Sequence, residues 1–189
     1  YSIIPLIGLS GELVTAGVLG LCLQLFHAIL GLSLSWQVGS QPAFVNYLLA
    51  SDGKQFLKFV DRISMVCFRT AVFISIIALA SLYVLDLIYP ILHRFGSLSN
   101  LIVFCLTAIM LSWVSPKTAA IRANKEDPFM FLSVCTAIAV ALTSWSSSYY
   151  QAFDYLPQVF LLIMILQTIF IVLIFNNWNK RNFLLIRTK

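Results

Sequence analysis

The sequence has few charged residues. Only 10% of its 189 residues are Asp, Glu, Lys or Arg, against about 25% in an ordinary soluble domain. Hydrophobic residues make up 60% of the chain, and the mean hydropathy is +0.94. So few charges cannot cover the surface of a soluble globule of this size. A soluble enzyme, a disordered tail and a small secreted disulfide-rich domain are therefore excluded.

Cysteine and histidine are also scarce, and neither forms a recognisable cluster. No Cys-x-x-Cys motif occurs, so the usual motif of disulfide exchange and of iron–sulfur ligation is missing. The sequence also lacks a nucleophile–base pair, a phosphate-binding glycine loop and a metal-ligand spacing. We therefore expect no metal site and, on balance, no enzyme activity. The isolated cysteines are Cys22, Cys67, Cys105 and Cys135.

Long charge-free runs are the main feature that the sequence does contain. About 20 mostly apolar residues are needed for a helix to cross the hydrocarbon core of a membrane, and five runs come close to that length. Strand-like alternation is absent, which favours helices. We predict an all-α, polytopic integral membrane helix bundle, with residues 1–189 as a single transmembrane domain; four or six spans are the alternatives. The predicted spans are about 11–35, 64–89, 98–115, 128–147 and 156–178.

Local residues account for the predicted span boundaries. Asp127 and Pro128 form an acidic cap followed by a proline at the first helical position, which starts the fourth span. Asp154 and Pro157 do the same for the fifth. Pro90 and Pro116 are expected to end the second and third spans, because proline cannot continue the helical hydrogen-bond ladder.

Basic residues predict the orientation in the membrane. With five spans, ten Lys and Arg residues fall on one side, Arg69 lies at its edge, and only Arg94 lies on the other side. The positive-inside rule then predicts the N-terminus outside and the C-terminus inside, in a plasma or bacterial inner membrane. No cleaved signal peptide and no nucleic-acid binding are expected. The ten are Lys54, Lys58, Arg62, Lys117, Arg122, Lys125, Lys180, Arg181, Arg187 and Lys189.

The connection between the first two spans predicts a short amphipathic cytoplasmic helix over about 54–63. Lys54 and Lys58 fall on one stripe, and Phe56 and Phe59 fall on the opposite face. Such a helix would lie in the interface with its basic residues toward anionic lipid. A solvated approach to the second span, or a helix that docks a soluble partner, would have the same pattern.

Three ionisable residues lie at or near membrane depth: Glu12, Arg69 and Asp86. Charges at this depth are costly and mark either an ion path or a packing pair. Because all three are predicted near an interface, we favour the structural interpretation, in which Arg69 extends its side chain to water. Glu12 and Asp86 share the outer end, where they would form a mouth that attracts cations.

His27 is the candidate cofactor ligand. It lies in the apolar part of the first span, whereas His93 follows the second span at the outer boundary, so one chain cannot place both on the same haem. The prediction is no cofactor, with His27 hydrogen-bonded to a neighbouring helix and sharing a polar face with Gln24. The alternative is a haem shared with another chain.

The leading functional hypothesis is a non-catalytic integral membrane subunit of a larger assembly, in transport or channel formation. Its expected partners are the lipid bilayer and either other membrane subunits or further copies of the chain. One alternative is a subunit of an energy-transducing or redox complex that contributes to an inter-subunit cofactor or quinone site. Another is a membrane anchor or sensor for a cytoplasmic partner.

Overall fold

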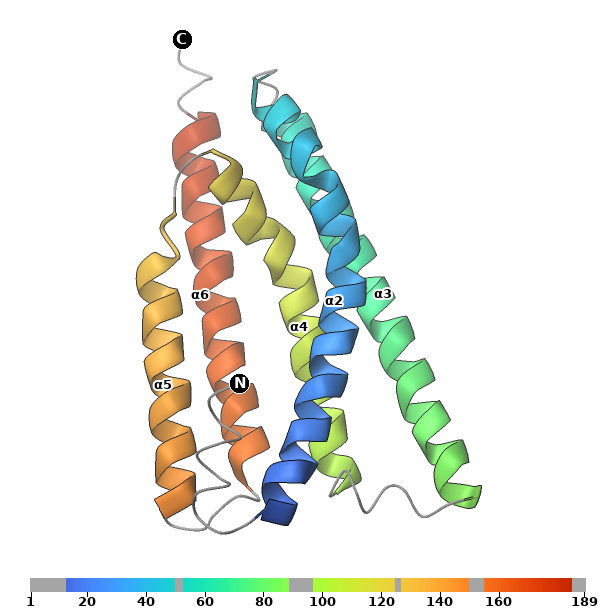
Figure 1. The fold of residues 1–189 in the computed structure, drawn as a ribbon. Helices are drawn as coiled ribbons and strands as arrows, with labels where there is room; N and C mark the ends of the chain where they lie inside the picture. The colour runs from blue at the N-terminus through green and yellow to red at the C-terminus, as the bar shows by residue number, and fades with distance from the viewer. Residues whose placement is uncertain (1–12, 50–52, 89–96, 125–126, 150–154, 185–189) are drawn as a thin grey trace.

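A computed structural model of the chain describes residues 13–49, 53–88, 97–124, 127–149 and 155–184. Within these ranges the chain is helical and contains no strand (Figure 1). The described residues form five helices that are long and apolar enough to cross a membrane, which confirms the predicted all-α class and agrees with the five predicted spans. The helices are α2 (Leu13–Leu49), α3 (Gly53–Ile88), α4 (Leu98–Ala123), α5 (Met130–Tyr149) and α6 (Leu156–Leu184).

The first two helices are much longer than the predicted spans. α2 has 37 residues and α3 has 36, which at about 1.5 Å per residue exceeds the roughly 30 Å of a hydrocarbon core. The predicted separate helix over 54–63 is therefore wrong in its boundaries, since these residues are the first turns of α3. Neither proline nor glycine interrupts α3 after Gly53, so nothing separates an amphipathic segment from the span that follows it.

The prediction that Pro116 ends the third span is also wrong, because α4 continues through it to Ala123. Pro116 lacks the N–H that would bond to the carbonyl of Ser112. Membrane helices tolerate this loss where neighbouring helices and hydroxyl side chains surround the break. Pro116 is fully buried, and the hydroxyl of Ser112 donates to the carbonyl of Ala108 at 2.8 Å, which reinforces the turn before the proline.

The predicted starts of the fourth and fifth spans lie close to those observed, although α5 begins at Met130 and Pro128 lies in the turn before it, not at the first helical position. Asp127 caps the approach to α5, because its Oδ1 accepts a hydrogen bond from the backbone N–H of Phe129 at 3.2 Å. Pro157 lies in the first turn of α6, where its missing N–H costs no hydrogen bond. α3 ends at Ile88, and Pro90 and Asp154 lie outside the described residues.

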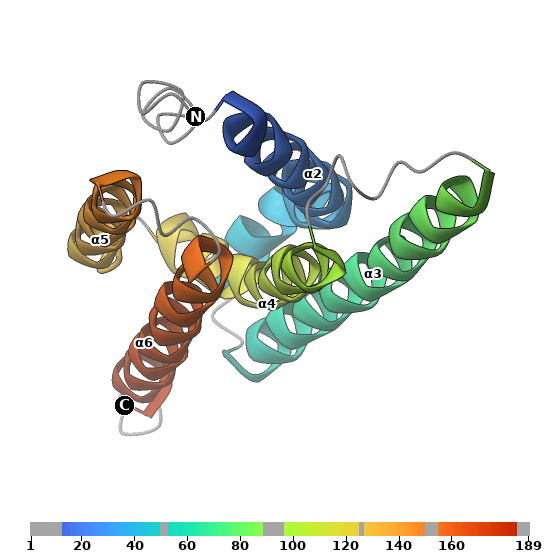
Figure 2. The same cartoon turned by 90° about the horizontal axis from the view of Figure 1, so that it is seen from below.

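α4 is the central helix of the bundle. It packs against α2, α3 and α6, while α5 packs against α6 (Figures 1 and 2). Two hydrophobic clusters hold these helices together, one around Phe26 and Phe104 and the other around Phe44, Phe56 and Trp178. The buried hydroxyls of Ser33 on α2 and Ser112 on α4 also share a hydrogen bond of 2.6 Å.

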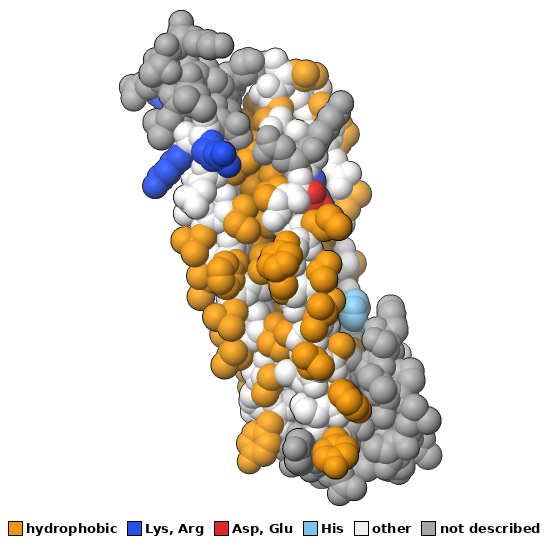
Figure 3. Space-filling view, turned by 90° about the vertical axis from the view of Figure 1, so that its left-hand side faces the viewer, with side chains coloured by type: hydrophobic (Ala, Val, Ile, Leu, Met, Phe, Trp, Pro, Cys, Tyr) orange, Lys and Arg blue, Asp and Glu red, His pale blue; other side chains and the backbone are white. Residues whose placement is uncertain are grey.

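Apart from Arg69 in the middle of α3, the basic side chains of the described residues lie toward one end of the bundle. This end contains the C-terminal ends of α2, α4 and α6 and the N-terminal ends of α3 and α5 (Figure 1). Figure 3 shows hydrophobic side chains over the middle of the face that carries α5, with Lys and Arg toward one end. The five-helix topology therefore segregates the charges as the sequence indicates. That this end faces the cytoplasm stays a prediction.

Candidate functional site

The three ionisable residues proposed at membrane depth do not form one site. Arg69 is exposed on the outward face of α3, between the exposed side chains of Met65 and Phe73. Asp86 is partly exposed in the last turn of α3, about 25 Å along the helix from Arg69 at about 1.5 Å per residue. Glu12 lies outside the described residues, so the proposed cation-attracting mouth stays a prediction.

His27 faces outward from α2. Its Nδ1 lies 2.7 Å from the carbonyl oxygen of Leu23, one turn earlier on the same helix, and its ring contacts that of Phe26 at 5.2 Å. This hydrogen bond stays within α2, and the bond predicted to a neighbouring helix stays a prediction. Gln24 is exposed as well. His93 lies outside the described residues.

The apolar residues proposed to lie in the interface are instead packed within the protein. Phe56 is fully buried, with its ring 6.4 Å from that of Phe44 and 6.2 Å from that of Trp178. Phe59 is partly buried, and its ring lies 4.9 Å from that of Tyr47. Lys54 and Lys58 are exposed on the other face of α3. The predicted amphipathic pattern is therefore real, but its apolar face covers α2 and α6.

Lys117 is a buried cation that the sequence did not identify. Its side chain is only 8% exposed, and its Nζ lies 3.7 Å from Oδ1 of Asp61 on α3. The same Nζ lies 4.3 Å from the ring centroid of Trp113 and 5.9 Å from that of Phe175. Because Asp61 is 70% exposed, the pair joins a buried ammonium group to a solvated carboxylate. Lys117 therefore fastens α4 to α3 and α6.

A polar groove runs along the opposite face of α4. Two neighbouring cavities, of about 240 and 350 Å³, share Ser115, Thr118 and Arg122 in their linings. α2 contributes the wall that includes Leu34 in the first cavity and Gln37 in the second. The beginning of α5 and the middle of α6 close the other side of the first cavity. We call these two neighbouring cavities together the α4 groove.

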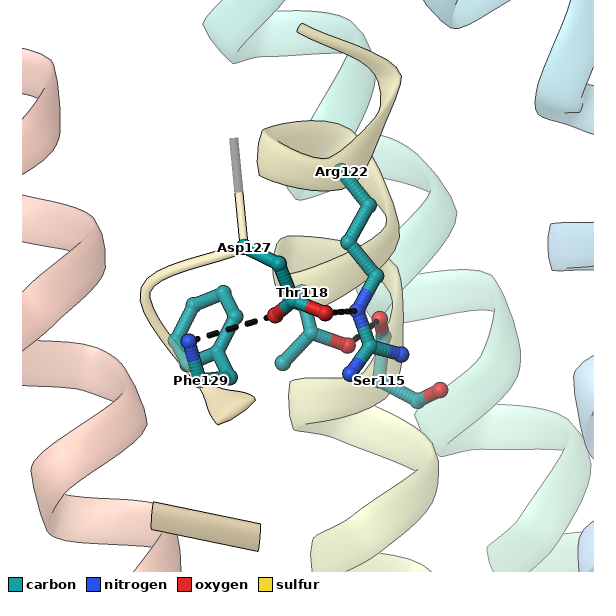
Figure 4. Close-up of polar contacts among 5 residues, drawn as sticks. All are labelled: Ser115, Thr118, Arg122, Asp127 and Phe129. Carbon is teal, nitrogen blue, oxygen red and sulfur yellow. Dashed lines mark hydrogen bonds and ion pairs between the residues drawn. The ribbon is translucent and has the colours of Figure 1, made fainter. Parts of the chain in front are cut away.

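Arg122 is held in a defined position at the end of the α4 groove. Its Nε lies 3.3 Å from Oδ2 of Asp127, whose other oxygen accepts from the N–H of Phe129 (Figure 4). The guanidinium group points back along α4 toward Thr118 and Ser115 (Figure 4). Thr118 donates its hydroxyl proton to the carbonyl of Ser115 at 2.7 Å. The Arg122 cation and the hydroxyl groups of Ser115 and Thr118 thus line the part that the two cavities share.

Sequence reasoning missed the α4 groove because it ended the helix at Pro116. The spacing Ser115-x2-Thr118-x3-Arg122 is i, i+3, i+7, which places the three residues on one helix face. A span allowed to continue through proline would have predicted this polar stripe. Because Arg122 was expected in a loop, the polar stripe was not predicted.

The residues that the structure describes show no group of three or more His, Cys, Asp and Glu side chains that could hold a metal ion. Comparison with family models, curated proteins and solved structures finds no similar protein. Identification therefore depends on the chain itself: its five apolar helices have the length and composition of an integral membrane protein.

Proposed function

We propose that the chain is a non-catalytic integral membrane subunit of a larger assembly, working in transport or channel formation. The observation that carries this proposal is a stripe of polar and small residues on the outer face of α2. Gln24, Ala28, Gly31 and Ser35 follow one another at intervals of four, three and four residues, and all four are exposed. They therefore share one face of the helix, turned away from the rest of the chain.

Such a face suits a second helix better than lipid. Lipid chains gain nothing from a polar amide, whereas small residues let two helix backbones approach closely and polar side chains hydrogen-bond across the contact. A Cβ atom added at Gly31 would meet nothing within 4 Å, so this glycine is not needed for packing within the chain. We infer that another transmembrane helix of the assembly covers the stripe.

The α4 groove supports transport or channel formation over a purely structural role. Its first cavity reaches Leu30 and Leu111 in the interior of two spans, yet it also contains the polar side chains of Gln167 and Ser133. Polar side chains at this depth are costly in lipid and suit a path for a polar or charged species. A neighbouring subunit would complete the wall of such a path.

The test places a photo-crosslinking residue at position 31 in native membranes, with the same residue at position 80 as the control. Ala80 is also small and exposed, but it lies among large apolar side chains on α3. We expect position 31 to give a protein adduct of higher mass and position 80 to give lipid adducts. In the same membranes, Gly31→Leu should lower the assembled fraction, while Ala80→Leu should not. Lipid adducts alone at position 31 would contradict the proposal.

A redox subunit is the second candidate, because His27 is exposed on the same side of α2 as the stripe and would face the covering helix. A haem between chains would then have an imidazole within reach. An absorbance spectrum of the purified assembly separates the two functions. A Soret band that disappears in His27→Ala favours the redox subunit, and a spectrum without a chromophore favours the transport subunit.

A further inference from the structure

We propose that the α4 groove binds an amphiphile with a phosphate or carboxylate group, whose anionic end contacts Arg122 and whose hydrocarbon end lies between α2 and α6. This inference does not rest on the proposed assembly, because every residue that lines the groove belongs to one chain.

The lining of the groove carries a positive charge. Among the described residues around the two cavities, Arg122 is the cation and no acidic residue contributes to either wall. Asp127 contacts Arg122 at Nε, and the side chain that carries the two terminal guanidinium nitrogens is 52% exposed. Those two nitrogens can bind a phosphate or a carboxylate in the bidentate geometry that arginine favours.

The Arg122 side chain points toward the groove. An arginine near the end of a membrane helix ordinarily extends toward water. Here Asp127 holds the guanidinium group so that it points back along α4, toward Ser115 and Thr118 (Figure 4). Asp127 is itself oriented by the N–H of Phe129. The Arg122 side chain is 52% exposed and also lines both cavities, so its guanidinium group is accessible to a ligand in the groove.

The apolar share of the lining rises from the second cavity to the first, although Ser133 and Gln167 add polar side chains to the first. The second cavity contains Gln37 and Gln41 beside Arg122, and the side-chain oxygen of Gln37 is buried without a hydrogen-bond partner in the described part of the chain. The first cavity continues past Val114 to Leu30. From Arg122 to Leu111 the groove follows eleven residues of α4, about 16 Å at about 1.5 Å per residue.

The length and lining therefore match a polar group joined to a hydrocarbon chain. The second cavity, of about 350 Å³, falls at the lower end of the range for small-molecule sites, roughly 300–1,000 Å³, and the first, of about 240 Å³, falls below it. If the ion pair between Arg122 and Asp127 had only a structural role, neither cavity beside it would be required. The buried oxygen of Gln37 would accept a hydrogen bond from a hydroxyl of the headgroup or from water.

The test measures ligand retention by native mass spectrometry of the full chain in mild detergent. The probes are phosphatidylglycerol, phosphatidylcholine, and inorganic phosphate, so that lipid headgroups and free anions are distinguished. The variants are Arg122→Gln, which removes the cation, and Thr118→Val, which removes a groove hydroxyl at nearly constant volume. Arg62→Gln is the matched control, because Arg62 is exposed on α3 and lines neither cavity.

We expect phosphatidylglycerol to bind more tightly than phosphatidylcholine, and Arg122→Gln to weaken its binding roughly tenfold, the equivalent of losing charge-assisted hydrogen bonds. Thr118→Val should weaken it less, and Arg62→Gln should have no effect. Phosphate that binds in an Arg122-dependent manner, without retained lipid, would identify a free anion as the source of the same chemistry. Equal retention of the two lipids, or equal loss in Arg122→Gln and Arg62→Gln, would overturn the proposal.

Discussion

Replacing Lys117 by methionine should leave the protein as stable as before or make it more stable. Methionine keeps an unbranched stem beside Trp113 and Phe175 and removes the ammonium group. Two favourable contacts of the ammonium group must be compared with the free-energy cost of burying it. The ion pair with Asp61, a carboxylate that is 70% exposed, is worth about 0–1 kcal/mol. The cation–π contacts add about 0.5–2 kcal/mol.

Against these gains stands the cost of removing the ammonium group from water. The Lys117 side chain is only 8% exposed, and burying a charge costs several kcal/mol even after the protein relaxes. Replacing a buried ion pair by apolar groups of similar volume is often neutral or stabilising by about 1–4 kcal/mol. Because Asp61 remains solvated when Lys117 is replaced, we expect a change between about 0 and 2 kcal/mol toward greater stability.

Two further variants make the prediction specific. Lys117→Ala also removes the stem, and truncation of a buried side chain to alanine costs about 2–5 kcal/mol, so it should destabilise strongly. Asp61→Asn leaves the buried ammonium group without its partner and should cost about 1 kcal/mol, since the lost carboxylate is exposed. In the Lys117→Met background, Asp61→Asn should have no effect.

The assay is denaturant-induced unfolding of the purified chain in detergent micelles, followed by tryptophan fluorescence, for the three single variants and the double variant. If Lys117→Met destabilises the protein as much as Lys117→Ala does, the charge itself stabilises the fold. The contacts of the ammonium group would then outweigh the cost of burying it, contrary to the prediction. If Asp61→Asn is equally costly with and without Lys117, the two residues are not coupled.

Three other predictions concern the ends and the outer face of the bundle. Phe56→Asp should lower the free energy of unfolding by at least about 3 kcal/mol, because Phe56 is fully buried. Lys58→Gln, at an exposed position, should change it by no more than about 0.5 kcal/mol. Unfolding midpoints compare the two variants, and equal effects would refute the buried position of Phe56. Arg69→Lys should preserve expression and thermal stability, since Arg69 faces outward and lysine can also extend to water. Normal expression of this variant with loss of the activity of the assembly would instead make Arg69 a site residue. A reporter fused after Lys189 should be cytoplasmic and one within 146–152 should be external, and a result on one common side would contradict the five-span orientation.

The connection between the first two spans shows where local pattern and tertiary structure diverge. The alternation of Phe56 and Phe59 with Lys54 and Lys58 is visible in the sequence and is preserved in α3. A sequence pattern states that one face is apolar, but it does not state what covers that face. Lipid and protein are equally acceptable to a phenylalanine, and only the position of α2 and α6 decides between them.

Pro116 shows the same limit for backbone structure. Proline ends most helices because it loses a hydrogen bond and crowds the preceding turn. In α4 the buried surroundings of Pro116 stabilise the helix beyond that cost, and the residues that follow become part of the bundle. Lys117 and Arg122 were therefore expected in a loop, but they lie on opposite faces of one helix.

What the sequence determined by itself is the all-helical class, the five spans and the separation of basic residues from apolar ones, because the length of a charge-free run and the positions of Lys and Arg are local properties. The tertiary structure alone decided that Lys117 is buried between aromatic rings and that Arg122 lines a groove. Both depend on which helices surround α4, and contacts between residues distant in the chain leave no periodic signal in the sequence.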